Sequence, residues 1–187
     1  MNPSLPANAR FKFLAIFVAA FCLLAVAQTA FAGPPNDACV LPVGLQHEIA
    51  SKYPTAKLIR VSDLDKDDGA LFQKEHGSPC PGLVKVDFYG DGKPTLALVL
   101  IEQVGGDEKA ELVVAHQIAD KWRTATLDSA PSSWPVVWAQ SPGEYMDVYG
   151  EKKVRATKPV IVFCGYSSWT IVYAWTGTAV TKVWIRD

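Results

Sequence analysis

Short apolar segments of strand-like composition, separated by turn residues, fill the chain from residue 83 onward and constrain its fold most. Residues 95–103 are almost continuously apolar, as in a strand that is covered on both faces. Residues 111–119 and 121–127 predict a hairpin that turns at Ala119-Asp120. Because consecutive strands with short links usually pair, these three segments and a fourth strand at 83–88 predict an antiparallel meander of four strands.

The rest of the chain adds helical segments and further strands. The remaining predicted elements are helices at 43–53 and 67–75, and strands at 57–61, 159–166, 168–175 and 180–187. Residues 129–138 are rich in Pro and Ser and predict a connection, whereas residues 144–158 are ambiguous. These patterns predict an α+β fold, with a short N-terminal helical part packed on a curled, meander-rich antiparallel β-sheet. A twisted sheet of about six to eight strands is expected to curl or to split in two.

The first 32 residues have the three parts of a cleavable secretory signal. Arg10 and Lys12 precede an unbroken apolar run at 13–27, and Ala30-Phe31-Ala32 offers the small residues that a signal peptidase reads. The run is 15 residues long, which is short for a bilayer span of about 20 helical residues. We therefore expect a signal peptide at 1–32, a single globular domain at 33–187, and a periplasmic or secreted location.

The charge balance excludes two classes of partner. The whole chain has 18 basic and 19 acidic residues; without Arg10 and Lys12 of the signal, 16 and 19 remain, a net charge of −3. The basic residues are scattered rather than clustered, which argues against a nucleic-acid partner and against an anionic membrane surface. After the signal, no apolar stretch is long enough to span a bilayer.

Three cysteines follow the signal. In the oxidising compartment that export implies, one disulfide and one free thiol are expected. Cys39 and Cys80 lie in loop-like segments beside prolines, whereas Cys164 lies in an apolar strand pattern typical of a buried thiol. We predict a Cys39–Cys80 disulfide, although the sequence alone leaves the two other pairings open.

Residues 87–95, DFYGDGKPT, form a loop with two carboxylates. The loop resembles the calcium loop of FG-GAP and VCBS repeat proteins, D-x-[ND]-G-D-G-x-x-D, and Asp87, Asp91 and both glycines match. The resemblance implies a calcium ion held by Asp87 and Asp91. Tyr89 and Thr95 stand where two further oxygen ligands are wanted, so we expect calcium to bind weakly or not at all. A plain hairpin loop is the alternative, which we favour.

Motifs of catalysis and of cofactor binding are absent from the sequence. It contains no nucleophile elbow, no Cys–His signature, no phosphate loop and no dinucleotide fingerprint. We therefore assign no catalytic residue and, apart from the calcium considered above, no cofactor. His116 shares one strand face with Val114 and Ile118 and is interpreted as a hydrogen-bonded sheet residue.

The segment between the two strands at 159–166 and 168–175 is a candidate contact surface. Tyr166, Ser167, Ser168 and Trp169 place aromatic rings next to hydroxyl groups at a hairpin tip, a combination typical of recognition surfaces. Core aromatics flanking a simple turn are the alternative, which we favour.

Over its length after the signal, the sequence resembles exported bacterial proteins of unknown function. The shared features are Cys-x-x-Pro at 39–42, Cys-Pro-Gly at 80–82 before D-F-x-G-D-G at 87–92, and a Trp-rich hairpin at 169–184. The resemblance implies a periplasmic or secreted setting and no assigned activity. We expect a small non-enzymatic binding domain, with another protein among the candidate partners. A calcium-stabilised structural domain and a hydrolase with dispersed site residues are the alternatives.

Overall fold

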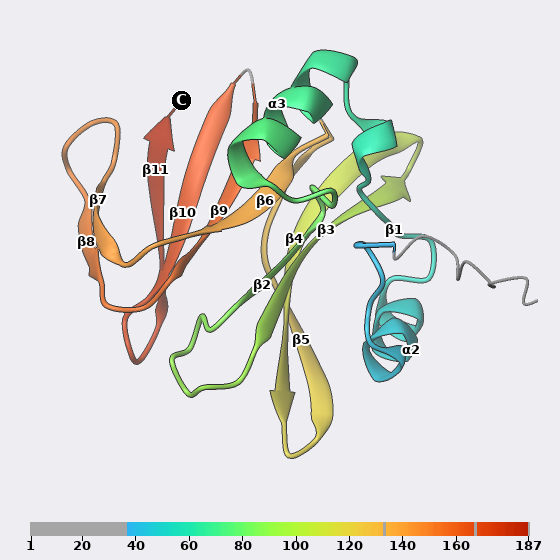
Figure 1. The fold of residues 1–187 in the computed structure, drawn as a ribbon, viewed down its shortest axis with the longest axis horizontal. Helices are drawn as coiled ribbons and strands as arrows, with labels where there is room; N and C mark the ends of the chain where they lie inside the picture. The colour runs from blue at the N-terminus through green and yellow to red at the C-terminus, as the bar shows by residue number, and fades with distance from the viewer. Residues whose placement is uncertain (1–36, 133, 167, 187) are drawn as a thin grey trace, which may run out of the picture. The chain divides into compact units, whose positions relative to one another are not determined.

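Two antiparallel β-sheets pack against each other in the computed structural model, and a helix covers the outer face of one of them (Figure 1). The structure describes residues 37–132, 134–166 and 168–186. The predicted signal peptide at 1–32 and Ser167 of the candidate contact surface lie outside the described residues. Neither described helix combines the length and apolar character that a bilayer span needs.

The helices are α2 (Val43–Lys52) and α3 (Lys66–His76), with a turn of 3-10 helix, η1, at Val61–Asp63. The strands of the first sheet are β1 (Lys57–Leu58), β2 (Leu83–Val86), β3 (Thr95–Val104), β4 (Asp107–Ile118) and β5 (Lys121–Pro131). Those of the second sheet are β6 (Val136–Gln140), β9 (Val160–Gly165), β10 (Trp169–Trp175) and β11 (Val180–Arg186). A separate hairpin consists of β7 (Gly143–Met146) and β8 (Lys153–Ala156).

In the first sheet, the strands β2 to β5 pair in the order of the sequence, which confirms the predicted meander. Both faces of β3 are buried, as its apolar composition predicts. Ala97, Val99 and Ile101 pack in the cluster shared with the second sheet. Leu98 and Leu100, on the opposite face, pack in the cluster that contains Leu45 and Ile49 of α2.

The second sheet, ordered β11-β10-β9-β6, is also covered on both faces. Ile161 and Phe163 of β9 pack toward the first sheet. Val160 and Val162 pack on the other side, in a cluster that includes Val154 of the β7–β8 hairpin. The predicted strands at the C-terminal end are therefore confirmed, and the hairpin explains why their apolar residues are continuous.

The α+β fold class is confirmed, and the antiparallel strands divide into two larger sheets and the two-stranded β7–β8 sheet, in line with the expectation that the sheet curls or splits. Both predicted helices begin and end within one residue of their predicted bounds. The predicted strand at 57–61 is wrong beyond Leu58, because the Asp63 carboxylate accepts the Arg60 backbone N–H at 2.8 Å where the chain turns into η1.

The predicted connection at 129–138 is also wrong. β5 continues to Pro131 along β4, and β6 begins at Val136 along β9. Backbone pairing with the neighbouring strands β4 and β9 outweighs a local composition that is typical of a loop. The ambiguous residues 144–158 contribute the β7–β8 hairpin.

The predicted Cys39–Cys80 disulfide is present, with its Cα atoms 5.4 Å apart, and Cys164 is free and buried. The bond ties the segment before α2 to the Cys-Pro-Gly segment before β2. Gly82 of that segment lies so close to Ile59 that an added Cβ would stand 2.5 Å from the Ile59 backbone oxygen. Only glycine fits this approach without a shift of the backbone.

Candidate ligand-binding site

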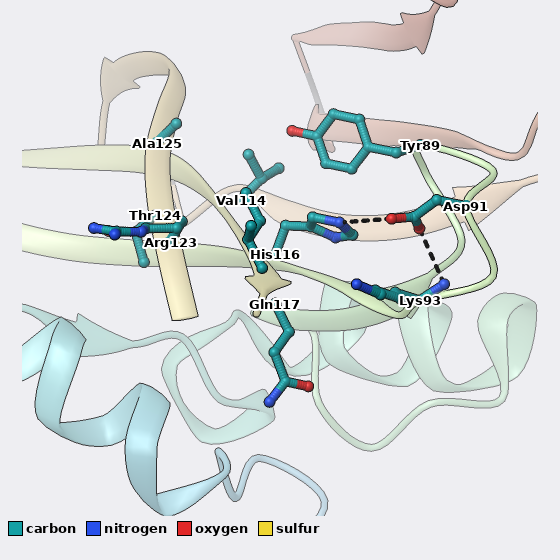
Figure 2. A pocket seen from close by; sticks show the side chains of 10 residues that line it. Tyr89, Asp91, Lys93, Val114, His116, Gln117, Arg123, Thr124 and Ala125 are labelled. Carbon is teal, nitrogen blue, oxygen red and sulfur yellow. Dashed lines mark hydrogen bonds and ion pairs between the residues drawn. The ribbon is translucent and has the colours of Figure 1, made fainter. Parts of the chain in front are cut away.

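A cavity of about 480 Å³ opens beside the ends of β4 and β5 that meet at the Ala119-Asp120 turn (Figure 2). The β2–β3 loop and the adjacent ends of the consecutive strands β4 and β5 line it. The lining residues are Tyr89, Asp91, Lys93, Val114, His116, Gln117, Ile118, Arg123, Thr124 and Ala125. The volume lies within the range of about 300–1,000 Å³ that is usual for small-molecule sites.

A chain of hydrogen bonds runs from the sheet into this cavity. Thr95 and His116 are partners in the β3–β4 register, and Thr95 Oγ1 lies 3.1 Å from His116 Nδ1. On the other side of the ring, His116 Nε2 lies 3.1 Å from Asp91 Oδ2. Because an ionised carboxylate only accepts, Nε2 carries the proton, and in the neutral ring Nδ1 accepts from the Thr95 hydroxyl. The imidazole is thereby held in one orientation.

The β2–β3 loop positions Asp91 through a tight turn. Asp91 Oδ1 accepts the Lys93 backbone N–H at 3.0 Å, and Gly90 and Gly92 on either side have φ angles of +69° and +77°. Glycine adopts this left-handed region without the steric cost that other residues meet. The Lys93 N–H, followed by the hydrogen bond and charge of His116, lowers the pKa of Asp91 below its ordinary value. Asp91 therefore faces the cavity as a carboxylate whose two oxygens are already engaged.

Tyr89 forms the aromatic wall of the cavity and links the two sheets. Its ring meets His116 edge-on at 4.7 Å between centroids and Trp175 of β10 edge-on at 5.1 Å. Burial raises the pKa of the Tyr89 hydroxyl. Within the described part of the chain this hydroxyl has no hydrogen-bond partner. Figure 2 shows Tyr89 and Lys93 on opposite sides of the His116 ring.

Two cations of the cavity rim are also unpaired. Among the described residues, neither Lys93 Nζ nor the Arg123 guanidinium has a hydrogen bond or a close ion pair. Glu48 of α2 contributes to the electrostatic surroundings of Arg123, but its carboxylate is bonded to Lys52 at 2.7 Å. The rim thus presents two exposed cations that no described residue pairs, together with the side-chain amide of Gln117.

The Thr95–His116–Asp91 chain has the residue types of a nucleophilic triad but lacks an accessible nucleophile. Thr95 is fully buried, and its hydroxyl lies behind the imidazole. A nucleophile must reach the reacting carbon of a bound substrate, which this hydroxyl cannot do. The arrangement orients His116 and Asp91 and satisfies a buried hydroxyl group.

The two carboxylates of the predicted calcium loop have different surroundings. Asp91 is bonded to His116 and to the Lys93 N–H, whereas Asp87 Oδ1 is buried and has no hydrogen-bond partner among the described residues. In the described ranges, no group of three or more His, Cys, Asp or Glu side chains is placed to hold a metal ion.

The candidate contact surface divides into inward and outward residues. Tyr166 packs beside Phe72 and Cys164, and burial raises the pKa of its hydroxyl far above the ordinary value. Trp169 meets Phe163 edge-on at 4.8 Å. Ser168 is exposed. The two aromatic rings thus contribute to packing between elements.

A second cavity, of about 300 Å³, lies where α3 meets β6. His76 stacks on Trp138 there, with ring centroids 4.3 Å apart, and burial lowers the pKa of His76. Its Nε2 is buried, has no hydrogen bond to any described residue, and lies 3.9 Å from Glu75 Oε2. The His76 ring thus packs α3 against β6. The first cavity, where several polar side chains lack a described partner, is the stronger candidate for a ligand-binding site.

Comparisons with protein-family models, with curated proteins and with solved structures found no match to this chain.

Proposed function

We propose that this protein is an exported, non-enzymatic binding domain and that the cavity around His116 is its ligand-binding site. The observation that carries the proposal is the meeting of free polar groups on Tyr89, Lys93 and Arg123 with the apolar side chains of Val114 and Ile118 in one cavity. Small-molecule sites have this character: mostly apolar walls with a few polar groups that fix orientation.

Two features support export. Residues 1–32 have the pattern of a cleavable signal. The Cys39–Cys80 disulfide is of the kind that persists in oxidising compartments. Cleavage after Ala32 would give a secreted or periplasmic chain that begins at Gly33.

The burial of Thr95 supports a binding role over a hydrolytic one. The imidazole–carboxylate pair is rigid, but its hydroxyl partner faces the interior. A hydrogen-bonded imidazole–carboxylate pair without a nucleophile suits recognition, because these two groups lose little conformational freedom when a ligand binds.

A thermal-shift screen of small metabolites, with a variant that fills the cavity, tests the binding role. Ala125 is exposed on the cavity wall, and Ala125→Trp places an indole in the space of the ligand. Ala70→Trp, at an exposed position of α3, is the matched control. We expect compounds that raise the unfolding midpoint of the wild type and of Ala70→Trp but not of Ala125→Trp. If every stabilising compound acts equally on all three proteins, the cavity is not the binding site.

A further inference from the structure

We propose that the ligand of this cavity carries a carboxylate next to an apolar group, and that Lys93 and Arg123 bind the carboxylate. This inference rests on the proposed function and specifies the chemical class of the ligand. It follows from which polar groups of the cavity are already satisfied.

The carboxylate and threonine acceptors of the cavity are engaged within the protein, whereas the side-chain amide of Gln117, which can accept as well as donate, has no hydrogen bond to a described residue. Asp91 Oδ1 accepts from the Lys93 backbone N–H, and Asp91 Oδ2 accepts from His116 Nε2. Thr124 Oγ1 accepts from Lys52 Nζ at 2.8 Å and donates to Glu48 Oε1 at 3.3 Å, so this hydroxyl of β5 is bonded to two side chains of α2. A cationic ligand would have to compete for carboxylate and hydroxyl groups that already have donors.

The donors of the cavity are free. Lys93, Arg123 and the Tyr89 hydroxyl have no hydrogen-bond partner among the described residues. With a neutral imidazole, the lining residues carry one acidic and two basic groups, a net charge of +1. Hydrogen bonds from charged donors to a carboxylate are roughly twice as strong as neutral ones, so an anion gains most from this rim.

The remaining walls define the other half of the ligand. Val114 is almost fully buried at the base of the cavity, whereas Ile118 is 55% exposed beside it. The Tyr89 ring and the Ala125 methyl group complete an apolar lining. An exposed isoleucine next to a cavity is a place where an apolar group of a ligand can bury surface that otherwise contacts water.

Free aromatic or aliphatic acids and the C-terminus of a peptide share this chemistry. The probes are 3-phenylpropionate with its amide, and N-acetylphenylalanine with its amide, each titrated into ¹⁵N-labelled protein by NMR. Each acid differs from its amide only in the charged group. We expect the acids to bind at least about tenfold more tightly than the amides, a difference of about 1.4 kcal/mol. Preference for N-acetylphenylalanine would identify a peptide terminus, and equal binding of the two acids a free acid.

Two charge-matched variants locate the effect. Lys93→Met/Arg123→Met removes both proposed contacts, and Lys152→Met/Arg155→Met removes the same charges at exposed positions on and beside β8. We expect the first pair to abolish the preference for acid over amide and the second to retain it, with unfolding midpoints measured for both.

Three outcomes would overturn the inference. If an amide binds as tightly as its acid, the site does not require an anion and the inference fails. If the NMR shifts in that experiment are still confined to the cavity, the proposal that the cavity is a binding site stands. Retention of the acid preference in Lys93→Met/Arg123→Met places the anion elsewhere. Absence of any shift at the cavity with all four probes excludes this ligand class, and the screen of Ala125→Trp then decides separately whether the cavity binds anything.

Discussion

At the scale of single residues, the hydrogen bond between Thr95 and His116 shows how one buried group fixes the geometry of the cavity. Thr95 is fully buried, and a buried hydroxyl needs a partner. His116 supplies it through Nδ1 and presents its other nitrogen to Asp91. The Thr95 hydroxyl thus helps to orient the imidazole, whose other nitrogen meets the carboxylate that the β2–β3 turn positions.

Removal of His116 should expose this dependence. His116→Leu leaves the Thr95 hydroxyl without its partner, and we expect the free energy of unfolding to fall by about 1–3 kcal/mol. In a Thr95→Val background the hydroxyl is already gone, so the same substitution should cost less. Urea denaturation of the four proteins measures the difference, and equal costs in both backgrounds would contradict the assigned role of the bond.

Asp128 joins the two sheets by charge and predicts a pH dependence. Its carboxylate accepts hydrogen bonds from Tyr173 and Lys182 of the second sheet. Burial alone would raise the pKa of Asp128, but the bonds from Lys182, Tyr173 and the Ser129 N–H lower it below the ordinary 3.8. A lowered carboxyl pKa stabilises the fold above the ordinary value, and the contribution is lost as the pH falls through the lowered pKa.

We therefore expect acid to destabilise the wild type more than Asp128→Asn below a pH of about 4. The measurement is the unfolding midpoint of both proteins from neutral pH to about pH 2. The pH profiles of the two proteins would coincide if Asp128 were not held ionised by its partners.

At the scale of elements, the sequence predicts those strands that are buried on both faces. β3, β9 and β10 have long apolar runs because neighbouring layers cover both of their sides. β6 was missed because its short apolar stretch lies among prolines and serines, and only β9 gives it ladder bonds. The β7–β8 hairpin has one exposed face, so its pattern stays ambiguous.

The sequence does not predict the cavity, because its lining residues come together only through the pairing of strands. The sequence predicts that His116 is a hydrogen-bonded sheet residue, and the structure confirms this, but its partner Asp91 is 25 residues away. Only the β3–β4 register, which sets Thr95 opposite His116, brings the loop and the strand together. Arg123 reaches the same cavity through the register of β5. The predicted turn at Ala119-Asp120 already implies the pairing of His116 with Arg123, whereas no local pattern indicates that the β2–β3 loop places Asp91 against His116.

Gly82 links the Cys-Pro-Gly segment to the start of β2 and gives an element-scale test. An added methyl group would press on the Ile59 backbone, and we expect Gly82→Ala to lower the free energy of unfolding by about 1–3 kcal/mol. Gly44→Ala is the control, since its methyl group would meet only the Trp122 side chain, at 3.3 Å. Chemical denaturation should show a larger loss of unfolding free energy for Gly82→Ala than for Gly44→Ala. Similar small losses in both variants would show that the approach of Gly82 to Ile59 does not require glycine.

The disulfide gives a second test at this scale. It closes a loop of 41 residues in sequence separation, so Cys39→Ala/Cys80→Ala should lose about 2–4 kcal/mol through greater freedom of the unfolded chain. Thiol labelling without reductant should modify one site, Cys164, and only after unfolding. A labelled Cys39 or Cys80 in protein recovered from an exported fraction would show that the bond does not form there.

At the scale of the whole molecule, four layers succeed one another in the described residues: α2, the first sheet, the second sheet and the β7–β8 hairpin. All three interfaces between these layers are filled with apolar side chains. The cavity opens beside this packing, where the β2–β3 loop brings Tyr89 between His116 and Trp175. The proposed binding role thus belongs to a loop and two strand ends supported by a rigid core.

The most direct test of the account is where ligands bind on the protein that begins at Gly33. A library of small acids, amines and neutral compounds is titrated into ¹⁵N-labelled protein, and the perturbed backbone amides are mapped. We predict shifts concentrated at residues 89–93, 114–118 and 123–125, with acids the most effective class. Shifts concentrated elsewhere, such as around His76 and Trp138, or binding by no compound of any class, would contradict the proposal that this cavity is the binding site.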